Sequence, residues 1–475
     1  MLQQAVDFVL NLGPQVMLPI ILTIFGLIFR QGFSKSFTAG VTVGVGFVGI
    51  FLVIDLLFSS LGPAAEAFVQ RTGVDLPIID VGWPIGAAIS FGTQVAPLLI
   101  PLVLAVNIAL LAMNWTKTMD VDLWNYWHFI FAASVMYYAT NNLLLALAVG
   151  VITAVIVLKL ADWTAPVIEH HFELPGVSLP HTETVNWAPL MYALNRVEER
   201  IPGFRDLNVS PEKLTERFGV FGQPMMLGLV LGLLIAVGAG LPLAQILTVG
   251  IETAALLTLL PRMVSLLMEG LVPLSEGVRD FIQSRFPGKD VYIGLDAAIV
   301  IGHPAGMATA LVMVPIVIFM AVLLPYNRML PLADLAVLPF VVIWPVAVSR
   351  GNIVRGLVNG IITMCFIFFF ATQFAALATE MGREVGFNFP AEAQGSPISG
   401  IDLGAHILPW LIINILQPGQ PYFWVAVVGA VLYGLTWWWV RNDIRHQYAA
   451  EIAEAEEARA EEKAEAEAEE RTGAG

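Results

Sequence analysis

Two stretches decide the fold: DLPIIDVGWP at residues 75–84 and VYIGLDAAIVIGHPAG at residues 291–306. Each is interrupted by glycine or proline, follows an amphipathic stretch that carries a glutamate, and precedes an apolar run. At membrane depth, irregular backbone of this kind is tolerated only where it is buried in protein or lines a cavity. Broken segments at corresponding places in two halves of a chain therefore indicate a transport site near the middle of the bilayer.

The two halves around these stretches resemble each other residue by residue. The distance in sequence between matched residues drifts only from 209 to 214 positions. Constant order and spacing indicate a duplicated membrane unit, a recurring plan among transporters. The matches pair Gly13, Met17 and Leu18 with Gly222, Met226 and Leu227; Gly40 with Gly250; Leu61, Pro63 and Glu66 with Leu271, Pro273 and Glu276; and Gly92 and Pro101 with Gly306 and Pro315.

Composition places the chain in a membrane. Hydrophobic residues make up 57% of it, charged residues only 13%, and the mean hydropathy is +0.77, whereas soluble domains carry about 25% charged residues. We predict an all-α polytopic membrane protein with two inverted repeats and re-entrant or broken segments. Its eleven expected transmembrane helices lie at about 14–31, 37–59, 95–113, 124–140, 141–162, 219–240, 243–261, 306–325, 331–349, 353–376 and 421–441.

Basic residues set the expected orientation. If Arg30 and Lys35 are cytoplasmic, the alternation of crossings leaves mainly Arg71, Arg328 and Arg383 outside. The positive-inside rule then places the N-terminus outside and the C-terminus inside. Five crossings in each repeat make the second repeat inverted relative to the first. The expected regions are a first transmembrane repeat at 1–164, a cytoplasmic loop at 165–218, a second repeat at 219–376, a re-entrant segment and last helix at 377–441, and an acidic cytoplasmic tail at 442–475.

Ionisable groups at membrane depth are the candidates for a site, because such groups are costly there unless they serve a function. Asp296 precedes an apolar helix, so it is either a ligand for hydroxyl groups or an N-cap. His303 either joins the ligand set or ties the tip of the broken segment to the backbone. Asp80 and Trp83 occupy the matching place in the first repeat, where Trp83 could face the C–H side of a polyol or anchor the membrane boundary.

His128 lies in an otherwise apolar crossing with Asn125 three residues earlier, on the same helical face. The functional interpretation is substrate contact, and the alternative is a hydrogen bond between helices. His181 and Glu183 lie in the polar 165–218 segment, where His181 is near enough to the membrane to reach the site. We find no P-loop, dinucleotide-binding or hydrolase motif and no metal-ligand spacing, and we expect neither a metal nor a cofactor.

Nine motifs together resemble the galactitol-specific IIC component of the bacterial phosphotransferase system, in the ascorbate–galactitol superfamily. They are spread along almost everything before the acidic tail. They are LGPQVMLPI at 12–20, VGFVGI at 45–50, LGPAAEAF at 61–68, IDVGWP at 79–84, VDLWNYWH at 121–128, FELPGVSLPH at 172–181, IGLDAAIVIGH at 293–303, RGN at 350–352 and GSPI at 395–398.

The resemblance implies a homodimer in the bacterial inner membrane that carries galactitol or a similar polyol inward by an elevator motion. It also implies that a cysteine on a separate IIB subunit, charged through a IIA subunit, phosphorylates the polyol. The single cysteine of this chain, Cys365, lies in an apolar run and is a poor candidate for that donor. By the same resemblance, the polyol site gathers residues 80–84, Asp296, His128 and His181. No nucleic-acid partner is expected.

Two other functions stay open on the sequence alone. An ion-coupled secondary transporter of a polyol or sugar would dedicate acidic residues to the ion, with Glu66, Glu276 and Asp296 as candidates. A receptor that binds a polyol without moving it is less consistent with a duplicated, inverted unit. Whether the chain counts as an enzyme depends on the partner that holds the phosphoryl donor.

Overall fold

A computed structural model of the chain is mostly helical and contains several apolar helices long enough to cross a membrane. It describes residues 14–28, 30–72, 76–204, 206, 209–211, 213, 223–285, 291–331, 333–386 and 395–453. Four spans within these residues are long and apolar enough, and the helix pair at 86–112, bent by 93°, makes a fifth. A polytopic membrane fold is therefore confirmed. The four are Leu143–His170, Pro304–Leu323, Ile353–Glu384 and Phe423–Gln447.

Corresponding elements occur in the same order in the two halves. The first half contains α2 (Pro14–Ile28), α3 (Phe33–Thr72), β1 (Ile78–Asp80), α4 (Trp83–Gly92), α5 (Ala96–Ala112), β2 (Thr118–Asp120), η1 (Leu123–Asn125), α6 (Tyr126–Thr140), α7 (Leu143–His170), β3 (Val177–Ser178), α8 (Thr182–Val185) and α9 (Ala188–Glu198). The second contains α11 (Pro224–Ala239), α12 (Leu243–Arg285), β4 (Tyr292–Gly294), η3 (Ala297–Ile299), α13 (Pro304–Leu323), β5 (Met329–Leu330), η4 (Leu335–Val337), α14 (Leu338–Val341), α15 (Ile343–Ala347), α16 (Ile353–Glu384), β6 (Ile398–Ser399), α17 (Ile401–Gly404), α18 (Ile407–Ile415), α19 (Phe423–Val440) and α20 (Asp443–Gln447).

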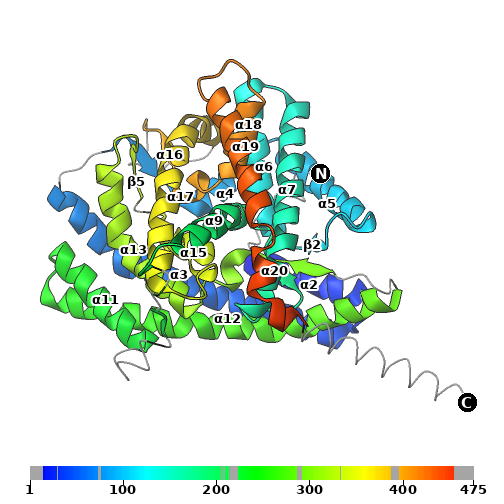
Figure 1. Ribbon diagram of the computed structural model, residues 1–475, viewed down its shortest axis with the longest axis horizontal. Coiled ribbons are helices and arrows are strands. Elements are labelled where there is room, and N and C mark those ends of the chain that lie inside the picture. The colour runs from blue at the N-terminus through cyan, green and yellow to red at the C-terminus, as the bar shows by residue number, and fades with distance from the viewer. Residues whose placement is uncertain are drawn as a thin grey trace, which may run out of the picture.

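Helices α2, α3, α11 and α12 pack mainly against one another, and we call them the helical frame. Helices α3 and α12 have 40 and 43 residues, which at 1.5 Å per residue makes each about 60 Å long, roughly twice the hydrocarbon thickness. The crossings expected at 37–59 and 243–261 lie within them. Figure 1 shows α12 running along one edge of the molecule, across the direction of α7, α16 and α19.

Two small parallel sheets join the halves, and the all-helical prediction missed them. In sheet A, β1 of the first half lies between β5 and β6 of the second, with Ile79 opposite Leu330 and Ile398. In sheet B, β4 of the second half lies between β2 and β3 of the first. In each sheet, the central strand therefore comes from one half of the chain and the two outer strands come from the other half. Strands of two or three residues are too short to produce a periodic pattern.

The segment at 331–349, expected to be one crossing, consists of the short helices η4, α14 and α15. Pro339 and Pro345 lie in α14 and α15. Proline has no N–H to donate and clashes with the preceding turn, which disfavours one continuous helix here. The broken segment at 75–84 ends in a turn in which Gly82 has φ 78°, a conformation that glycine adopts without strain.

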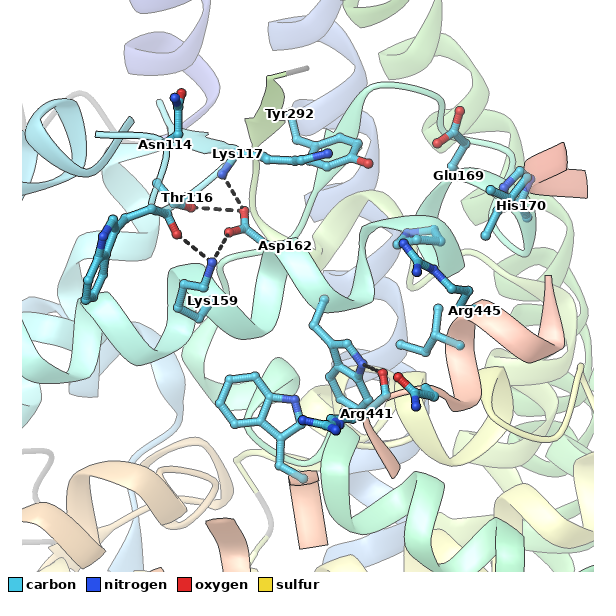
Figure 2. A pocket seen from close by; sticks show the side chains of 17 residues that line it. Asn114, Thr116, Lys117, Lys159, Asp162, Glu169, His170, Tyr292, Arg441 and Arg445 are labelled. Carbon is cyan, nitrogen blue, oxygen red and sulfur yellow. Dashed lines mark hydrogen bonds and ion pairs between the residues drawn. The ribbon is translucent and has the colours of Figure 1, made fainter. Parts of the chain in front are cut away.

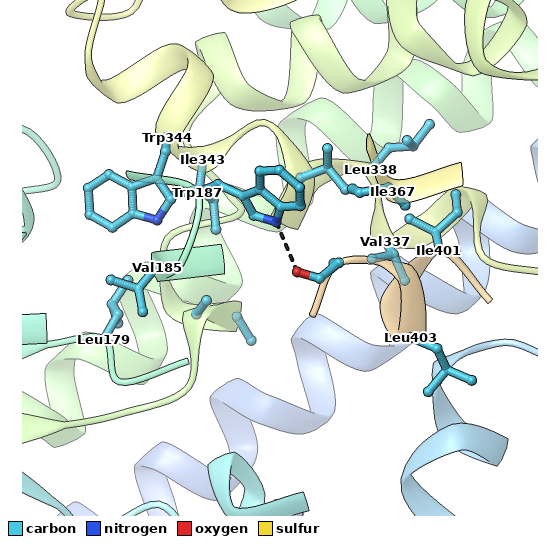
Figure 3. Packing of buried hydrophobic residues seen from close by; sticks show 14 of the residues in the cluster. Leu179, Val185, Trp187, Val337, Leu338, Ile343, Trp344, Ile367, Ile401 and Leu403 are labelled. Atoms are coloured by element: carbon cyan, nitrogen blue, oxygen red, sulfur yellow. Dashed lines mark hydrogen bonds between the residues drawn. The ribbon is translucent and has the colours of Figure 1, made fainter. Parts of the chain in front are cut away.

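Much of the segment at 165–218, expected to be a polar loop, is packed into the interior. The segment from β3 to α9 buries Leu179, Val185 and Trp187 in the same hydrophobic core as Trp344 of α15. Figure 3 shows this packing, in which the Trp187 indole N–H donates to the Ala405 carbonyl at 3.0 Å. The side of the membrane on which the segment lies remains a prediction. Gly13, Gly222 and residues 454–475 of the acidic tail lie outside the described residues.

Candidate substrate-binding site

The carboxyl edge of sheet B brings three polar side chains together. Because parallel strands end at the same edge, the segments that follow β2, β4 and β3 place Asp122, Asp296 and His181 near one another. All three side chains are buried. The Asp122 carboxylate accepts from the Asp296 N–H at 3.0 Å and from the Trp124 N–H at 3.0 Å. One carboxylate from the first half therefore holds the broken segment of the second.

Asp296 and His181 form a buried ion pair. The distance from His181 Nε2 to Asp296 Oδ2 is 3.3 Å. Burial lowers the pKa of His181, but the facing Asp296 carboxylate, together with Glu183 and Asp122, outweighs this effect, so the pKa is raised above 6.5. Asp296 Oδ1 also accepts from the Ala298 N–H at 2.7 Å. The two interpretations of Asp296 are thus compatible, because one oxygen caps η3 while the other faces the histidine.

A chain of hydrogen bonds fixes the tautomer of His128. Its Nδ1 lies 3.0 Å from Nε2 of His406, and His406 Nδ1 lies 2.8 Å from the Asp402 carbonyl oxygen. A carbonyl only accepts, so His406 Nδ1 carries the proton; burial lowers the pKa of His406 to about 3, which keeps its ring neutral. His406 Nε2 must then accept from His128 Nδ1. In neutral His128, Nε2 is therefore an acceptor.

The side chains of His128, His181 and Glu183 converge. Each offers one polar atom, and these atoms lie within 4.8 Å of one another. The ring centroids of His128 and His181 are 4.4 Å apart. Burial raises the pKa of Glu183 to about 8. Two imidazoles and a carboxylate could also hold a transition-metal ion, a site that the sequence spacing did not suggest. We call His128, His181, Glu183 and Asp296 the central cluster.

The carboxyl edge of sheet A also gathers acidic side chains. The Asp80 carboxylate accepts from the Gly82 N–H at 3.1 Å and from the Asp334 N–H at 2.7 Å. Asp334 accepts from the Trp83 N–H at 2.7 Å and from the Asp402 N–H at 3.2 Å. Asp80 and Asp334 thus bind the segments that follow β1, β5 and β6. The Trp83 ring packs edge-on against Trp124, with centroids 5.9 Å apart.

Two of the predicted site residues make their contacts elsewhere. Asn125 Nδ2 donates to Asp120 Oδ1 at 3.0 Å, which supports the end of β2. The His303 ring lies against His171, with centroids 4.7 Å apart, and against Phe172. The structure therefore brings together His128, His181, Glu183 and Asp296, places Asp80 and Trp83 at sheet A, and keeps His303 in a separate contact.

Sequence reasoning missed Asp122, Asp334, Asp402 and His406. Asp122 lies within a motif quoted above, but it was read only as part of that motif. Asp122 and Asp334 both accept backbone N–H groups from a broken segment of the other half, so they correspond in role. Extending the repeat past the broken segments could have found this pair. His406 carries no signal of that kind, because its partner His128 is 278 positions away.

Comparison with known proteins matches this architecture to one family. Residues 8–392 match the family described as "PTS system sugar-specific permease component". The chain belongs to this permease family. The "PTS system galactitol-specific EIIC component" of Escherichia coli (strain K12) is 36% identical over 443 residues, which cover 93% of this chain and 97% of the relative. The "Putative permease IIC component" of the same strain is 38% identical over 413 residues, covering 87% and 94%.

Membership of the permease family agrees with the apolar helices, and together they make this chain a multi-pass subunit of the inner membrane. A IIC component works with the IIB and IIA subunits of its phosphotransferase system. The expectation of a phosphotransferase IIC subunit is therefore confirmed.

Proposed function

We propose that this permease binds galactitol or a similar polyol in the central cluster and carries it inward for phosphorylation by a IIB subunit. The observation that carries the proposal is a set of buried polar atoms without a hydrogen-bond partner within the described chain. They are His128 Nε2, His181 Nδ1 and Glu183 Oε1. The printed name of the Escherichia coli relative supports galactitol as the first polyol to test.

Polyol hydroxyl groups fit these atoms because each hydroxyl can both donate and accept. The hydrogen bonds from His128 through His406 to the Asp402 carbonyl leave His128 Nε2 as an acceptor for one hydroxyl. A buried polar atom without a partner costs about 1–3 kcal/mol, and a bound hydroxyl would remove that cost. Binding would therefore complete the hydrogen bonds of the central cluster.

For transport, we propose eleven crossings, an extracellular N-terminus and a cytoplasmic C-terminus, with the rest of each protomer moving past the helical frame. Supporting this, the frame helices pack mainly against one another, whereas the strands that carry the site pair across the two halves. Two such units would form the homodimer. The phosphoryl donor would reside on the IIB partner, since Cys365, the single cysteine, is half-buried in α16.

Uptake of radiolabelled galactitol into sealed vesicles tests this proposal. Vesicles supplied with the IIB protein and with phosphorylated IIA as the phosphoryl source should accumulate galactitol phosphate, and vesicles lacking either should not. Accumulation of free galactitol driven by a Na⁺ or H⁺ gradient alone would instead establish the secondary transporter. Uptake of other hexitols in parallel would identify the preferred substrate.

A separate measurement distinguishes a polyol site from a metal site at the same atoms. The purified chain is treated with a chelator, and its metal content and galactitol binding are measured before and after. We expect galactitol binding to be unchanged by the chelator, and the untreated protein to contain less than one equivalent of metal per chain. If the protein instead holds one equivalent of metal, and removing that metal abolishes galactitol binding, the three atoms His128 Nε2, His181 Nδ1 and Glu183 Oε1 are not polyol ligands and the assignment is overturned.

A further inference from the structure

A second polar cavity lies at the amino ends of β2 and β4, away from the central cluster. Its volume is about 520 Å³, and it is bounded by the ends of α5 and α19 and the C-terminal part of α7. Figure 2 shows its basic side chains, which come from these separate segments. Lys117, Lys159, Arg441 and Arg445 line it, against only two acidic residues, Asp162 and Glu169. None of the four residues of the central cluster contributes to its wall.

One of the two acidic side chains is fully engaged. Asp162 Oδ2 lies 3.1 Å from Lys159 Nζ. Its Oδ1 accepts from the hydroxyls of Thr116 and Thr118 and from the Lys117 N–H, each at 2.9 Å. Lys159 also donates to the Trp115 carbonyl. Asp162 therefore organises this wall of the cavity, and its charge is balanced by Lys159, so the cavity keeps an excess of positive charge.

Arg441 and Arg445 supply that excess. Both are exposed, and within the described parts of the chain neither guanidinium is paired with a carboxylate. The Trp163 indole N–H donates to the Arg441 carbonyl at 2.9 Å, which ties the end of α19 to α7. Guanidinium groups fit the oxygens of a phosphate particularly well, because their N–H donors form a planar fork.

The surroundings of the cavity are those of a membrane boundary. Trp163 and Trp437 pack with centroids 6.0 Å apart, and Trp115 is 63% exposed. Tryptophan is enriched at the level of lipid head groups. From the cavity, α19 runs away with an exposed apolar stripe that includes Val428 and Leu432. The basic cavity, the tryptophans around it and the exposed apolar face of α19 thus lie in the same order as the head group, the interfacial region and the acyl chains of a phospholipid.

We propose that this cavity binds a phosphate ester, namely the head group of an anionic phospholipid whose acyl chains lie along α19. Basic pockets between transmembrane helices on the cytoplasmic side bind such head groups in general. The same side chains would accept a soluble phosphate ester, so the experiment must separate the two sources.

The test measures thermal stabilisation of the purified full-length chain in detergent by short-chain phosphatidylglycerol, by phosphatidylcholine of equal chain length, and by glycerol 3-phosphate. We expect the anionic lipid to stabilise at concentrations well below those of the other two. The double variant Arg441→Gln/Arg445→Gln should need about 30-fold more anionic lipid for the same shift. Arg383→Gln, at an exposed arginine in the last turn of α16, is the matched control and should behave as the parent.

Equal stabilisation by the two lipids, or an unchanged lipid response in the double variant, would overturn the proposal. Stabilisation by glycerol 3-phosphate that the double variant loses would support a phosphate site and assign it to a soluble ester. Galactitol binding serves as the folding check, because neither arginine contacts the central cluster. It should be equal in the double variant and the parent.

Discussion

The carboxyl edges of sheets A and B are built alike and are used differently. In sheet A, both Asp80 and Asp334 give their oxygens to backbone N–H groups of the turns that follow the strands. In sheet B, Asp122 does the same, but His181 pairs with Asp296 and keeps Nδ1 without a partner. Both edges leave buried polar atoms without a partner in the described chain: the two carboxylate oxygens of Asp402 at sheet A, and His181 Nδ1 and Glu183 Oε1 at sheet B. Of these two sets, only the second includes an imidazole nitrogen.

This difference separates support from recognition. A carboxylate whose oxygens accept two backbone N–H groups holds the turns that carry them, and losing it would leave those donors unsatisfied. An imidazole nitrogen without a partner gains a hydrogen bond only when a ligand arrives. The duplication therefore supplies two similar scaffolds, and we expect sheet A to stabilise the fold while sheet B, with His128, binds the substrate.

The largest expected effect comes from removing the His181 side chain at the carboxyl edge of sheet B. His181→Ala removes an open nitrogen and leaves Asp296 buried without its partner, so galactitol affinity should fall by about 100-fold or more. The measurement is equilibrium binding of labelled galactitol to purified protein. His303→Ala is the matched control, since it removes the same side chain from the contact with His171, and affinity should stay within about 2-fold.

Because His181→Ala can also weaken folding, His181→Gln is measured beside it. Glutamine retains a donor and an acceptor, so the protein should keep its thermal stability while losing most of its affinity. A larger loss of affinity in His303→Ala than in His181→Gln would contradict the central cluster as the binding site.

The next effect should appear at sheet A as lost stability. Asp334→Ala removes the acceptor of the Trp83 and Asp402 N–H groups, and the free energy of unfolding should fall by about 3 kcal/mol. Asp334→Asn keeps one acceptor oxygen and should lose roughly half as much. Thermal unfolding followed by size-exclusion chromatography measures both. An Asp334→Ala protein with unchanged stability but no galactitol binding would mean that sheet A belongs to the binding site.

A smaller effect is expected at the hydrogen-bond chain that links the two edges. His406→Phe removes the acceptor that holds the proton on His128 Nδ1, so His128 can present a protonated Nε2 to the ligand instead. We expect galactitol affinity to fall by about 10-fold. His406→Gln can accept from His128 and donate to the Asp402 carbonyl, so it should restore most of the affinity. Equal losses in the two variants would show that His406 acts by packing alone.

The sequence predicted the parts of this comparison unevenly. His128, His181 and Asp296 could be found because polar groups at membrane depth are rare and because they lie in family motifs. The pairing of β1 with β5 could not, since strands this short leave no pattern and the Trp83–Asp334 bond spans 251 positions. Asp402 carries no sequence signal of its own until sheet A places it beside Asp334. The duplication predicted two similar broken segments, but neither the sheets beside them nor which of the two edges would carry imidazole nitrogens.

The smallest effect concerns Glu183 and has a defined pH dependence. Burial raises the pKa of this carboxyl from its ordinary value of 4.5 to about 8, so the folded protein favours the protonated form. The stabilising contribution of that form is fully present below pH 4.5 and is lost as the pH rises through about 8. Glu183→Gln removes this loss, because glutamine stays neutral. The melting temperature of Glu183→Gln should therefore match the parent near pH 5 and exceed it by a few degrees, on the order of 3 °C, near pH 8.5.

Thermal unfolding at three pH values between 5 and 8.5 measures this difference, with Glu380→Gln, at an exposed position on α16, as the control that should show a constant offset. Parallel melting curves for Glu183→Gln and the parent would mean that Glu183 ionises freely. A freely ionising Glu183 would be in contact with water. The carboxyl edge of sheet B would then not be the water-excluded binding site that we propose. A difference in melting temperature that widens with pH, by contrast, requires the Glu183 carboxyl to be as well shielded from water as the carboxylates of sheet A. It must also keep one oxygen without a hydrogen-bond partner in the protein. That combination is what a neutral polyol needs, because its hydroxyl groups compete poorly with water for an exposed carboxylate.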